Sequence, residues 1–544
     1  MSIGSDVGAG NLPQAEFKTP QIGGLIRLIA EQLLPQLTRA AILASSIRII
    51  SDEVAAVTLP NGFSFLRIAF SFTSHVPEAR STAAFKLIQL EEGGIKIFTV
   101  ATALQELTEV PWQPLIPKQP SHHVESSPDY CLPKETDVLI VGGSGGGLTM
   151  AAYLKSLDIP FVLVDKEEAI GLSWSKRYES ATLHTIKAFS GLPFIPFPEQ
   201  YPEYVPAKLI AQYYASYAQS LDLPTICGCE CKSATWDEDK CFWKVILNHR
   251  GKEQRLSVRH IVFAVGIFGR FPIKPSFPGQ ENFGGATLHS AAYTNPSTWK
   301  GKKVAVVGAS TTGIDVAYDC SRMGINVTMV QRGATRVYPE GHLAEIKKPF
   351  WNNNSSPDIG DTLTTKDPVV LQSAVTSAAF LLLSKTFDPA YLEVLRKAGF
   401  LAVEEGSLQQ QIFCRGGAHY PDVGTCQDII NGKIKVKSGA CIKAFTPTGL
   451  SFSDGSHLQA DVVCFATGFE KDLRKQLSGI IGRKAADRLE PIWGLDDEGE
   501  AHGDPRGIQA CGYKEAIYKP CAIMASFLQY TLRPNLRAQD RNTQ

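Results

Sequence analysis

The stretch VLIVGGSGGG, residues 138–147, places five glycines in the six positions 142–147, directly after an apolar run. A buried strand that passes through a glycine turn into a helix is typical of dinucleotide binding, because glycine lets the backbone approach the pyrophosphate. Unpaired N–H groups and the helix dipole favour phosphate at the helix N-terminus. The run FVLVD follows, and its Asp165, 23 residues after Gly142, fits the acid that binds the ribose.

The same arrangement returns later in the chain. KKVAVVG (302–308) leads into the turn GASTTG (308–313), and NVTMVQR ends at Arg332. A guanidinium at this strand end suits a 2′-phosphate and predicts NADP rather than NAD, with a solvated surface charge as the alternative. In both turns a serine, Ser144 or Ser310, stands at the middle glycine of G-x-G-x-x-G. Its Cβ crowds the pyrophosphate slightly, while its hydroxyl is able to donate to it.

The alternation of strand-like and helical runs sets the fold class. After residue 131 it predicts an α/β protein with two dinucleotide-binding (Rossmann-like) domains. Before it, helical apolar spacing at 25–43 and two expected hairpins, TLPNGFSF and AAFKLIQL–EEGG–IKIFTV, predict a small α+β domain. A Pro/Ser/His-rich stretch ending near residue 131 is interpreted as a linker.

The totals exclude several classes of function. Lys+Arg and Asp+Glu balance at 54 each, so nothing favours nucleic acid or an anionic membrane. The apolar stretch near AAFLLL (378–383) is far shorter than the ~20 residues of a membrane-spanning helix. The N-terminus lacks the pattern of a secretory signal, and twelve scattered cysteines are typical of reduced thiols. We therefore expect a cytoplasmic protein.

One cysteine cluster is a candidate metal site. Cys227, Cys229 and Cys231 form a C-x-C-x-C set that a soft metal could use. We interpret it instead as one strand whose i, i+2 and i+4 thiols share a face. Since no His or further Cys lies at zinc-like spacing, we expect no metal.

Further segments carry a family resemblance. FGGATLHSAAY (283–293) fits the fingerprint F-x-G-x-x-x-H-x-x-x-Y, and FATGF (465–469) follows a late buried strand. GLSWSKRYESATLHTIKAFSGLPFIPFPEQYPEYVP adds a third match. With them, residues from about 135 to 495 resemble the flavin-containing monooxygenases, in particular the plant and fungal YUCCA-like branch. The unit before them resembles a shortened SnoaL/NTF2-like cone.

The resemblance implies the cofactors FAD and NADPH and the residues that bind them. For FAD these are Gly142, Ser144, Gly147, Asp165, Trp174, His184, Thr467 and Gly468. For NADPH they are Gly308, Ser310, Gly313 and Arg332. The candidate catalytic residues are His184, His289 and Tyr293. Of these, His289 is expected to organise the loop between the two domains rather than to act as an acid or base.

The resemblance also divides the chain. We expect an N-terminal domain with its linker at 1–131, a first part of the FAD domain at 132–298, an NADPH domain with an insertion at 299–437, and a second part of the FAD domain at 438–544. The insertion, about 340–435, is expected to cover the substrate side, with His419 in its GGAHY run.

The chemistry implied by the resemblance is a monooxygenation. In this family a hydride passes from NADPH to FAD, dioxygen adds to give a C4a-hydroperoxyflavin, and one oxygen atom enters a small organic substrate. We expect N- or S-oxygenation or oxidative decarboxylation, with secondary metabolism as a setting. The expected partners are the substrate and dioxygen, without nucleic acid, and a homodimer is a candidate assembly.

Three alternatives stay open. Baeyer–Villiger chemistry is the nearest, although Tyr293 stands where those enzymes usually have Trp. A flavin-binding protein that has lost turnover is favoured by the two serine-for-glycine changes and by a C-terminus, from about residue 500, that keeps little of the family pattern. A pyridine-nucleotide disulfide reductase would need a redox cysteine pair, yet no cysteine lies between Cys131 and Cys227.

Overall fold

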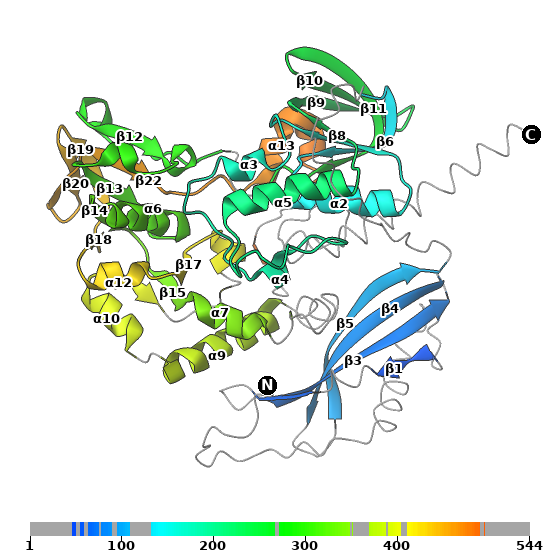
Figure 1. The fold of residues 1–544 in the computed structure, drawn as a ribbon, viewed down its shortest axis with the longest axis horizontal. Coiled ribbons are helices and arrows are strands. Elements are labelled where there is room, and N and C mark those ends of the chain that lie inside the picture. Colours follow the sequence, from blue (N-terminus) through cyan, green and yellow to red (C-terminus); the bar gives the residue numbers. More distant parts are fainter. Residues whose placement is uncertain are drawn as a thin grey trace, which may run out of the picture. The chain divides into compact units, whose positions relative to one another are not determined.

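The protein divides into two compact units, each described by itself. The computed structural model describes residues 46–49, 55–58, 64–75, 78–89, 95–108, 132–266, 271–348, 351, 369–387, 390–403, 408, 411–489 and 494–495. The N-terminal strands lie in one unit, and every described residue from 132 onward lies in the other. The ribbon in Figure 1 is coloured along this order.

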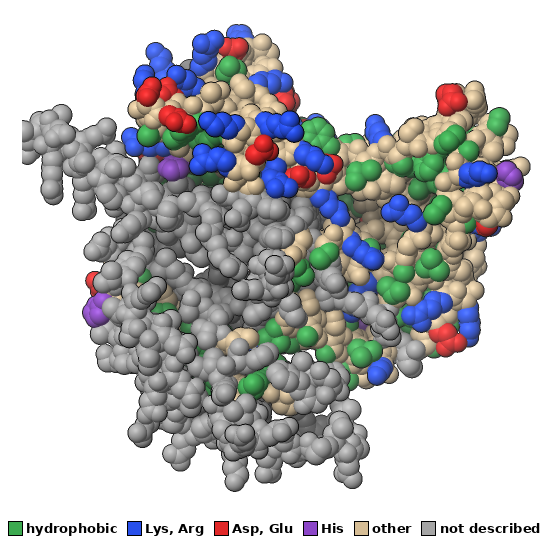
Figure 2. Space-filling view, turned by 180° about the vertical axis from the view of Figure 1, so that it is seen from behind, with side chains coloured by type: hydrophobic (Ala, Val, Ile, Leu, Met, Phe, Trp, Pro, Cys, Tyr) green, Lys and Arg blue, Asp and Glu red, His purple; other side chains and the backbone are tan. Residues whose placement is uncertain are grey.

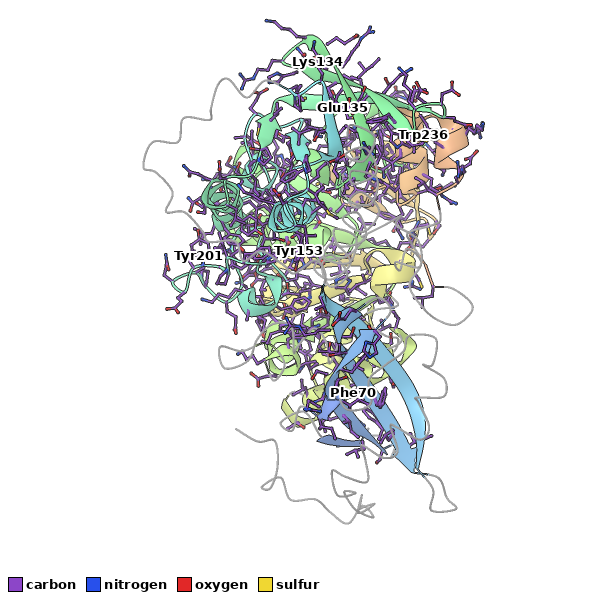
Figure 3. All side chains as sticks on the ribbon, turned by 90° about the vertical axis from the view of Figure 1, so that its right-hand side faces the viewer. Phe70, Lys134, Glu135, Tyr153, Tyr201 and Trp236 are labelled. Carbon is purple, nitrogen blue, oxygen red and sulfur yellow. The ribbon has the colours of Figure 1, made fainter. Side chains whose placement is uncertain are left out.

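The N-terminal unit is an antiparallel sheet. Its strands are β1 (Arg48–Ile49), β2 (Ala55–Thr58), β3 (Ser64–His75), β4 (Glu78–Gln89) and β5 (Ile95–Leu107). Pairing of β2 with β3 and of β4 with β5 confirms both predicted hairpins. Phe70, labelled in Figure 3, packs edge-to-face on Phe85 with ring centroids 4.6 Å apart. The helix predicted at 25–43 lies outside the described residues, so the SnoaL/NTF2-like assignment stays a prediction.

The first sheet of the second unit carries the VLIVGGSGGG stretch. Its order is β8 (Thr225–Cys227), β7 (Phe161–Asp165), β6 (Glu135–Val141), β11 (Lys252–Phe263), β10 (Phe242–His249) and β9 (Cys229–Asp237), with the first four parallel. Val138 and Ile140 face the core under α2 (Gly145–Ser156) and α5 (Ala207–Ser220), two helices that lie beside this sheet in Figure 1. Tyr153 belongs to the same core and Tyr201 packs at its edge; both are labelled in Figure 3. Leu139 and Val141 face the opposite core, which α13 (Leu473–Ile481) covers.

The second sheet repeats this plan around the second glycine turn. It consists of β12 (Ala286–His289), β22 (Val462–Phe465), β13 (Lys303–Val307), β14 (Asn326–Gln331) and β18 (Ile434–Ser438), all parallel. Val304 and Val306 face α6 (Thr311–Arg322), while Ala305 faces a small sheet of β19 (Ile442–Thr446), β20 (Gly449–Phe452) and β21 (His457–Gln459). The predicted α/β fold with two dinucleotide-type domains is confirmed.

An insertion separates β14 from β18. It contains β15 (Thr335–Pro339), α7 (Glu340–Lys347), α9 (Val369–Phe387), α10 (Tyr391–Lys397), β16 (Ala402–Val403), a π-helical turn η7 (Gln411–Arg415), β17 (His419–Asp422) and α12 (Thr425–Ile430). β15 pairs in parallel with β16 and with β17. The apolar run at 378–383 falls within α9. Within the described ranges, no helix has both the length and the apolar content to cross a bilayer.

Short elements complete the second unit. They are the helical turns α3 (Leu172–Ser175), α4 (Lys187–Ser190) and α14 (Arg483–Ala486) and the 3-10 turns η4 (Gln280–Asn282), η5 (Ser290–Ala292) and η6 (Ser297–Trp299). On the face shown in Figure 2, basic and acidic side chains of the described residues are interspersed, in keeping with the balanced formal charge of the chain.

The expected domain division stays a prediction, and one expectation about the cysteines needs correction. The second sheet takes β12 from before residue 299 and β22 from after residue 437. The reason is that parallel strands pair without regard to their order along the chain. The C-x-C-x-C set is not one strand, because Gly228, with φ +66°, lies between the end of β8 and the start of β9. Cys229 and Cys231 are buried in β9, and no metal-binding group occurs among the described residues.

Candidate active site

The first glycine turn is closed by a steric fit that only glycine allows. Gly142 has a φ of +112°, and a Cβ there would lie 2.4 Å from the carbonyl oxygen of Ala264. At Gly147 a Cβ would lie 1.8 Å from the Gly142 oxygen. Real Cβ atoms do not approach oxygen so closely, so both positions fix the packing of helix α2 against its own strand and against β11.

The second turn repeats the fit almost atom for atom. Gly308 has a φ of +122°, and its Cβ would lie 2.4 Å from the oxygen of Ala466, while that of Gly313 would lie 2.1 Å from the Gly308 oxygen. Ala264 and Ala466 are the second residues of the equivalent segments FAVG and FATG. The N–H of Ala264 donates to the Val141 oxygen and that of Ala466 donates to the Val307 oxygen, both at 2.8 Å. The two glycine turns therefore share the same steric arrangement and the same backbone hydrogen bond.

The helix N-termini at both turns are left without side-chain caps. Ser144 and Ser310 are the N-cap residues of α2 and α6, and neither hydroxyl makes the capping hydrogen bond. Serine at this position usually does so. Ser144 Oγ instead accepts from Trp174 Nε1 at 3.3 Å, and Ser310 Oγ accepts from the N–H of Ala418 at 3.0 Å. Uncapped N–H groups at a helix start suit a pyrophosphate, so both turns fit a dinucleotide.

A single cavity of about 1900 Å³ extends over both turns. Of the residues singled out from the sequence, it is lined by Gly142, Ser144, Asp165, Trp174, His184, Tyr293, Gly308, Ser310, Arg332, Thr467, Gly468 and His419. Gly147, Gly313 and His289 are not among its lining residues. They lie behind the wall and hold it in place.

The strand-end residues Asp165 and Arg332 differ in how they are held. The Asp165 carboxylate accepts from the N–H of Gly143 at 2.5 Å and from that of Glu167 at 2.8 Å. Burial raises its pKa, and the two backbone hydrogen bonds act in the opposite direction. Arg332 is exposed at the cavity, because the preceding Gln331 turns inward and binds both backbone groups of Leu401. The first strand end is thus acidic and fixed, and the second is basic and open.

The wall beside the first turn is aromatic and cationic. The guanidinium of Arg177 lies 4.2 Å from the centre of the Trp174 ring, at cation–π distance. Tyr214 packs edge-to-face on the same indole. A flat, apolar surface with one fixed charge suits a planar aromatic ligand.

The fingerprint segment braces the crossing after β22, and Tyr293 at its end also lines the cavity. A Cβ at Gly285 would lie 2.5 Å from the Phe283 ring, so that ring lies where a side chain would stand. His289 Nδ1 accepts from the Ala291 N–H at 3.1 Å, which leaves its Nε2–H to donate to the Gly468 oxygen at 3.1 Å. Burial lowers the pKa of His289, which favours this neutral form. The histidine ties β12 to the crossing after β22.

Thr467 and Gly468 lie where the chain leaves the second sheet for α13. Thr467 Oγ1 donates to the Ile273 oxygen at 2.5 Å, and the Gly468 oxygen also accepts from the Ile273 N–H at 2.9 Å. Both residues line the cavity at this crossing. The FATG segment therefore packs on the second turn and leads toward the first sheet.

A network that the sequence did not reveal joins the two halves. Tyr178 Oη donates to Asp315 at 2.7 Å, and Asp319 accepts from Ser180 and from Tyr293, both at 2.8 Å. Burial raises the pKa of Asp315 to about 7. The two acids are four residues apart and so share one face of α6, and their place in the largely apolar run IDVAYD is the only local signal for them. Their partners, more than 130 residues away for Tyr178 and Ser180, cannot be read from that pattern.

A family model described as pyridine nucleotide-disulphide oxidoreductase matches residues 139–353, which include both glycine turns. Probable indole-3-pyruvate monooxygenase YUCCA3 of Arabidopsis thaliana is 31% identical over 62% of this chain and 73% of its own length. Indole-3-pyruvate monooxygenase YUCCA1 of Oryza sativa subsp. japonica is 30% identical over 62% of this chain and 77% of its own.

Solved structures agree on the fold. A cyclohexanone monooxygenase from Rhodococcus, bound to NADP+, has a TM-score of 0.53 at 18% identity and covers 74% of this chain and 87% of its own. A steroid monooxygenase bound to NADP has a TM-score of 0.51 at 16% identity, over 75% of this chain and 87% of its own.

Proposed function

Since this chain belongs to the flavin-containing monooxygenase family, in its YUCCA-like branch, we propose that its first turn binds FAD and its second turn binds NADPH in the shared cavity. The chain is an NADPH-dependent flavin monooxygenase whose cofactors are FAD and NADPH and whose co-substrate is dioxygen. The observation that carries the assignment of each turn is that one cavity is lined by both of them.

The proposed FAD site lies at the first glycine turn. Uncapped N–H groups at the start of α2 would bind the pyrophosphate, in the space that Gly142 and Gly147 keep open by packing the helix close. Asp165 would accept from the ribose with the lone pairs that the backbone leaves free. Trp174 and His184 would lie against the flavin side, and Thr467 and Gly468 would close it.

The proposed NADPH site uses the same device with a different charge. The start of α6 would bind the pyrophosphate beside Gly308 and Ser310, with Gly313 packing the helix. The exposed guanidinium of Arg332 would bind the 2′-phosphate, because a charged bidentate donor matches that group. This is the residue on which the preference for NADPH over NADH would depend.

When bound, FAD supplies hydride acceptance from NADPH and activation of dioxygen. This chain's part is to bind, orient and keep water out. His289 and Tyr293 are proposed as positioning residues, because the first braces the crossing at Gly468 and the second donates to Asp319 across the two halves. His184, which lines the cavity, is the residue we propose to contact the reacting end.

For the substrate we propose a 2-oxo acid that undergoes oxidative decarboxylation. The support is that the relatives are named as monooxygenases of indole-3-pyruvate, together with three cationic side chains on the cavity wall, Arg177, Arg415 and Lys471. The reaction consumes the 2-oxo acid anion, dioxygen, NADPH and a proton, and yields the shortened carboxylate, carbon dioxide, water and NADP+. One oxygen atom enters the carboxylate product and the other leaves as water.

Product analysis tests this substrate class. Arylpyruvates, a tertiary amine, a sulfide and a cyclic ketone are each offered with NADPH, and carbon dioxide and oxygenated products are counted per NADPH consumed. About one carbon dioxide per NADPH with a 2-oxo acid is the expected result. Oxygenation of the amine, sulfide or ketone without decarboxylation would contradict the proposal and favour the other reactions of the family.

We further propose that the insertion covers the substrate side, with His419 at the cavity wall. His419 lines the cavity next to the second turn, and its Nδ1 has no partner among the described residues. His419→Ala is expected to raise the KM for the 2-oxo acid about tenfold, the loss of one hydrogen bond to a charged group, while the Kd of NADP+ changes less. Unchanged kinetics on every substrate would contradict this role.

A cytoplasmic location and a homodimer are also proposals. The free thiols of Cys320 and Cys464 suit a reducing compartment. Light scattering on the FAD-loaded protein measures the assembly, and a mass of one chain, about 59.2 kDa, would contradict the dimer.

A further inference from the structure

The serine of the second turn is bonded to the substrate-side insertion. Ser310 Oγ accepts from the Ala418 N–H at 3.0 Å and lies 3.4 Å from the His419 oxygen, to which it donates. The next residue, Thr311, donates to the same oxygen at 3.1 Å. A Cβ at Gly417 would lie 3.2 Å from Ser310 Oγ, a tight contact that glycine avoids.

The segment that receives these bonds is conformationally strained. Ala418 has a φ of +61°, a region that costs an L-residue roughly 1–2 kcal/mol. Its oxygen is held by the Arg336 N–H at 2.9 Å, where β15 pairs with β17. A backbone in this region persists only when its surroundings fix it. Ser310 supplies the fixing bond on the side of the nucleotide turn.

The same segment is part of the cavity wall. Gly416, Gly417, Ala418 and His419 all line the cavity. Any shift of the Ser310 hydroxyl therefore moves a wall that we assign to the substrate. At the first turn Ser144 bonds to Trp174, a residue of its own half, so this link to the insertion is peculiar to the second turn.

We propose that Ser310 is a positioning residue that couples occupancy of the pyridine-nucleotide turn to the conformation of residues 416–419, and so to substrate binding. This inference rests on the proposed role of the second turn. A bound nucleotide fixes the turn, the turn fixes the Ala418 N–H through Ser310, and the wall takes its substrate-binding form. By linkage, substrate tightens NADP+ by the same factor.

At this position the serine side chain therefore acts as a hydrogen-bonding group rather than as a steric obstacle to the pyrophosphate. The hydroxyl is engaged within the protein, so it is not needed as a donor to the pyrophosphate. Ser310→Gly restores the standard glycine and removes the whole side chain, and NADP+ is added at a concentration that saturates each variant. Ser310→Ala removes only the oxygen and keeps the Cβ.

Hydrogen–deuterium exchange on the FAD-loaded protein tests the coupling directly. The probe is NADP+, and the observable is exchange in peptides covering 414–420, with trypsin cleavage after Arg415 as a second readout. In the wild type, saturating NADP+ is expected to slow both about fivefold, the effect of securing one hydrogen bond. In Ser310→Ala and Ser310→Gly the slowing is expected to vanish while NADP+ still binds.

Ser321→Ala is the matched control. It removes a hydroxyl from the same helix, one that donates to Asp428 at 2.7 Å, away from the turn. It should behave as the wild type does. NADP+ that binds the wild type without slowing exchange at 414–420, or slows it equally in Ser310→Ala, overturns the coupling alone. A wild type that binds no NADP+ in a fluorescence titration overturns the proposed second-turn site as well.

Discussion

The two glycine turns have the same backbone and opposite surroundings. A Cβ added at Gly142 would lie 2.4 Å from the Ala264 oxygen, and one added at Gly308 would lie 2.4 Å from the Ala466 oxygen. Beyond that fit, the first turn faces an acid and an indole, and the second faces a guanidinium and the insertion. The comparison shows that steric closure makes a dinucleotide site, while the residues around it decide which dinucleotide binds and what its binding changes.

The largest effects are expected from substitutions that add a Cβ to one glycine turn and leave the other unchanged. Gly147→Ala places a Cβ 1.8 Å from the Gly142 oxygen, and Gly313→Ala places one 2.1 Å from the Gly308 oxygen. Each should cost about 3 kcal/mol of unfolding free energy. The first should purify without FAD, while the second should keep FAD and fail to bind NADP+. Both are measured by flavin absorbance and nucleotide titration.

Gly479→Ala is the control for this pair. It lies in α13 with nothing within 4 Å of an added Cβ, and it should stabilise the protein by about 0.5 kcal/mol through helix propensity. Loss of both cofactors from Gly313→Ala would contradict the separate assignment of the turns.

The charge contrast at the strand ends predicts the next effect. Arg332→Gln should weaken NADPH by roughly 30-fold, the loss of about 2 kcal/mol of charged hydrogen bonding, and should leave NADH nearly unchanged. The Kd values from anaerobic titration of both nucleotides measure it. An equal loss for NADH would show that Arg332 acts on the shared part of the molecule instead.

The network between the two halves predicts a pH effect. Burial raises the pKa of Asp315 from 3.8 to about 7, with Asp319 adding like charge and the Tyr178 hydrogen bond opposing the shift. Because the folded state binds this proton more tightly, unfolding free energy falls as pH rises between those two values. Asp315→Asn keeps an acceptor for Tyr178 and should stabilise the protein by about 2 kcal/mol at about pH 8, with less effect near pH 4. Denaturant titrations at both pH values measure it, and destabilisation at the higher pH would refute it.

The smallest effect concerns the fingerprint tyrosine. Tyr293→Phe removes one donor from Asp319, which keeps the bond from Ser180, so we expect a loss of about 1 kcal/mol in unfolding free energy. Tyr201→Phe, whose ring packs on Phe197, serves as the control and should change little. A larger loss in the control would mean that the hydroxyl to Asp319 is not what Tyr293 contributes.

The parts predicted from sequence are those with local signals. VLIV alternates between two cores because it is buried on both faces, and glycine alone admits the turn that follows. Asp165 was found by its spacing from Gly142, and it lies beside the turn as expected. A strand, a glycine turn and a helix that follow one another directly are determined by interactions within about 30 residues.

The parts that were missed depend on distant pairs. The bond between Ser310 and Ala418 spans 108 residues, and that between Tyr178 and Asp315 spans 137. The sequence around either residue of such a pair does not indicate which distant residue is its partner. The same holds for β22, whose place next to β13 follows from sheet pairing rather than from its position late in the chain.

The central claim is that one cavity brings NADPH on the second turn to FAD on the first. Anaerobic stopped-flow absorbance tests it most directly, with the FAD-loaded wild type mixed with NADPH or with NADH. We predict loss of the oxidised-flavin band with NADPH, and reduction at least about tenfold slower with NADH at equal subsaturating concentration, as the Arg332 charge requires. A flavin that stays oxidised with NADPH, or that NADH reduces equally fast, would contradict the account.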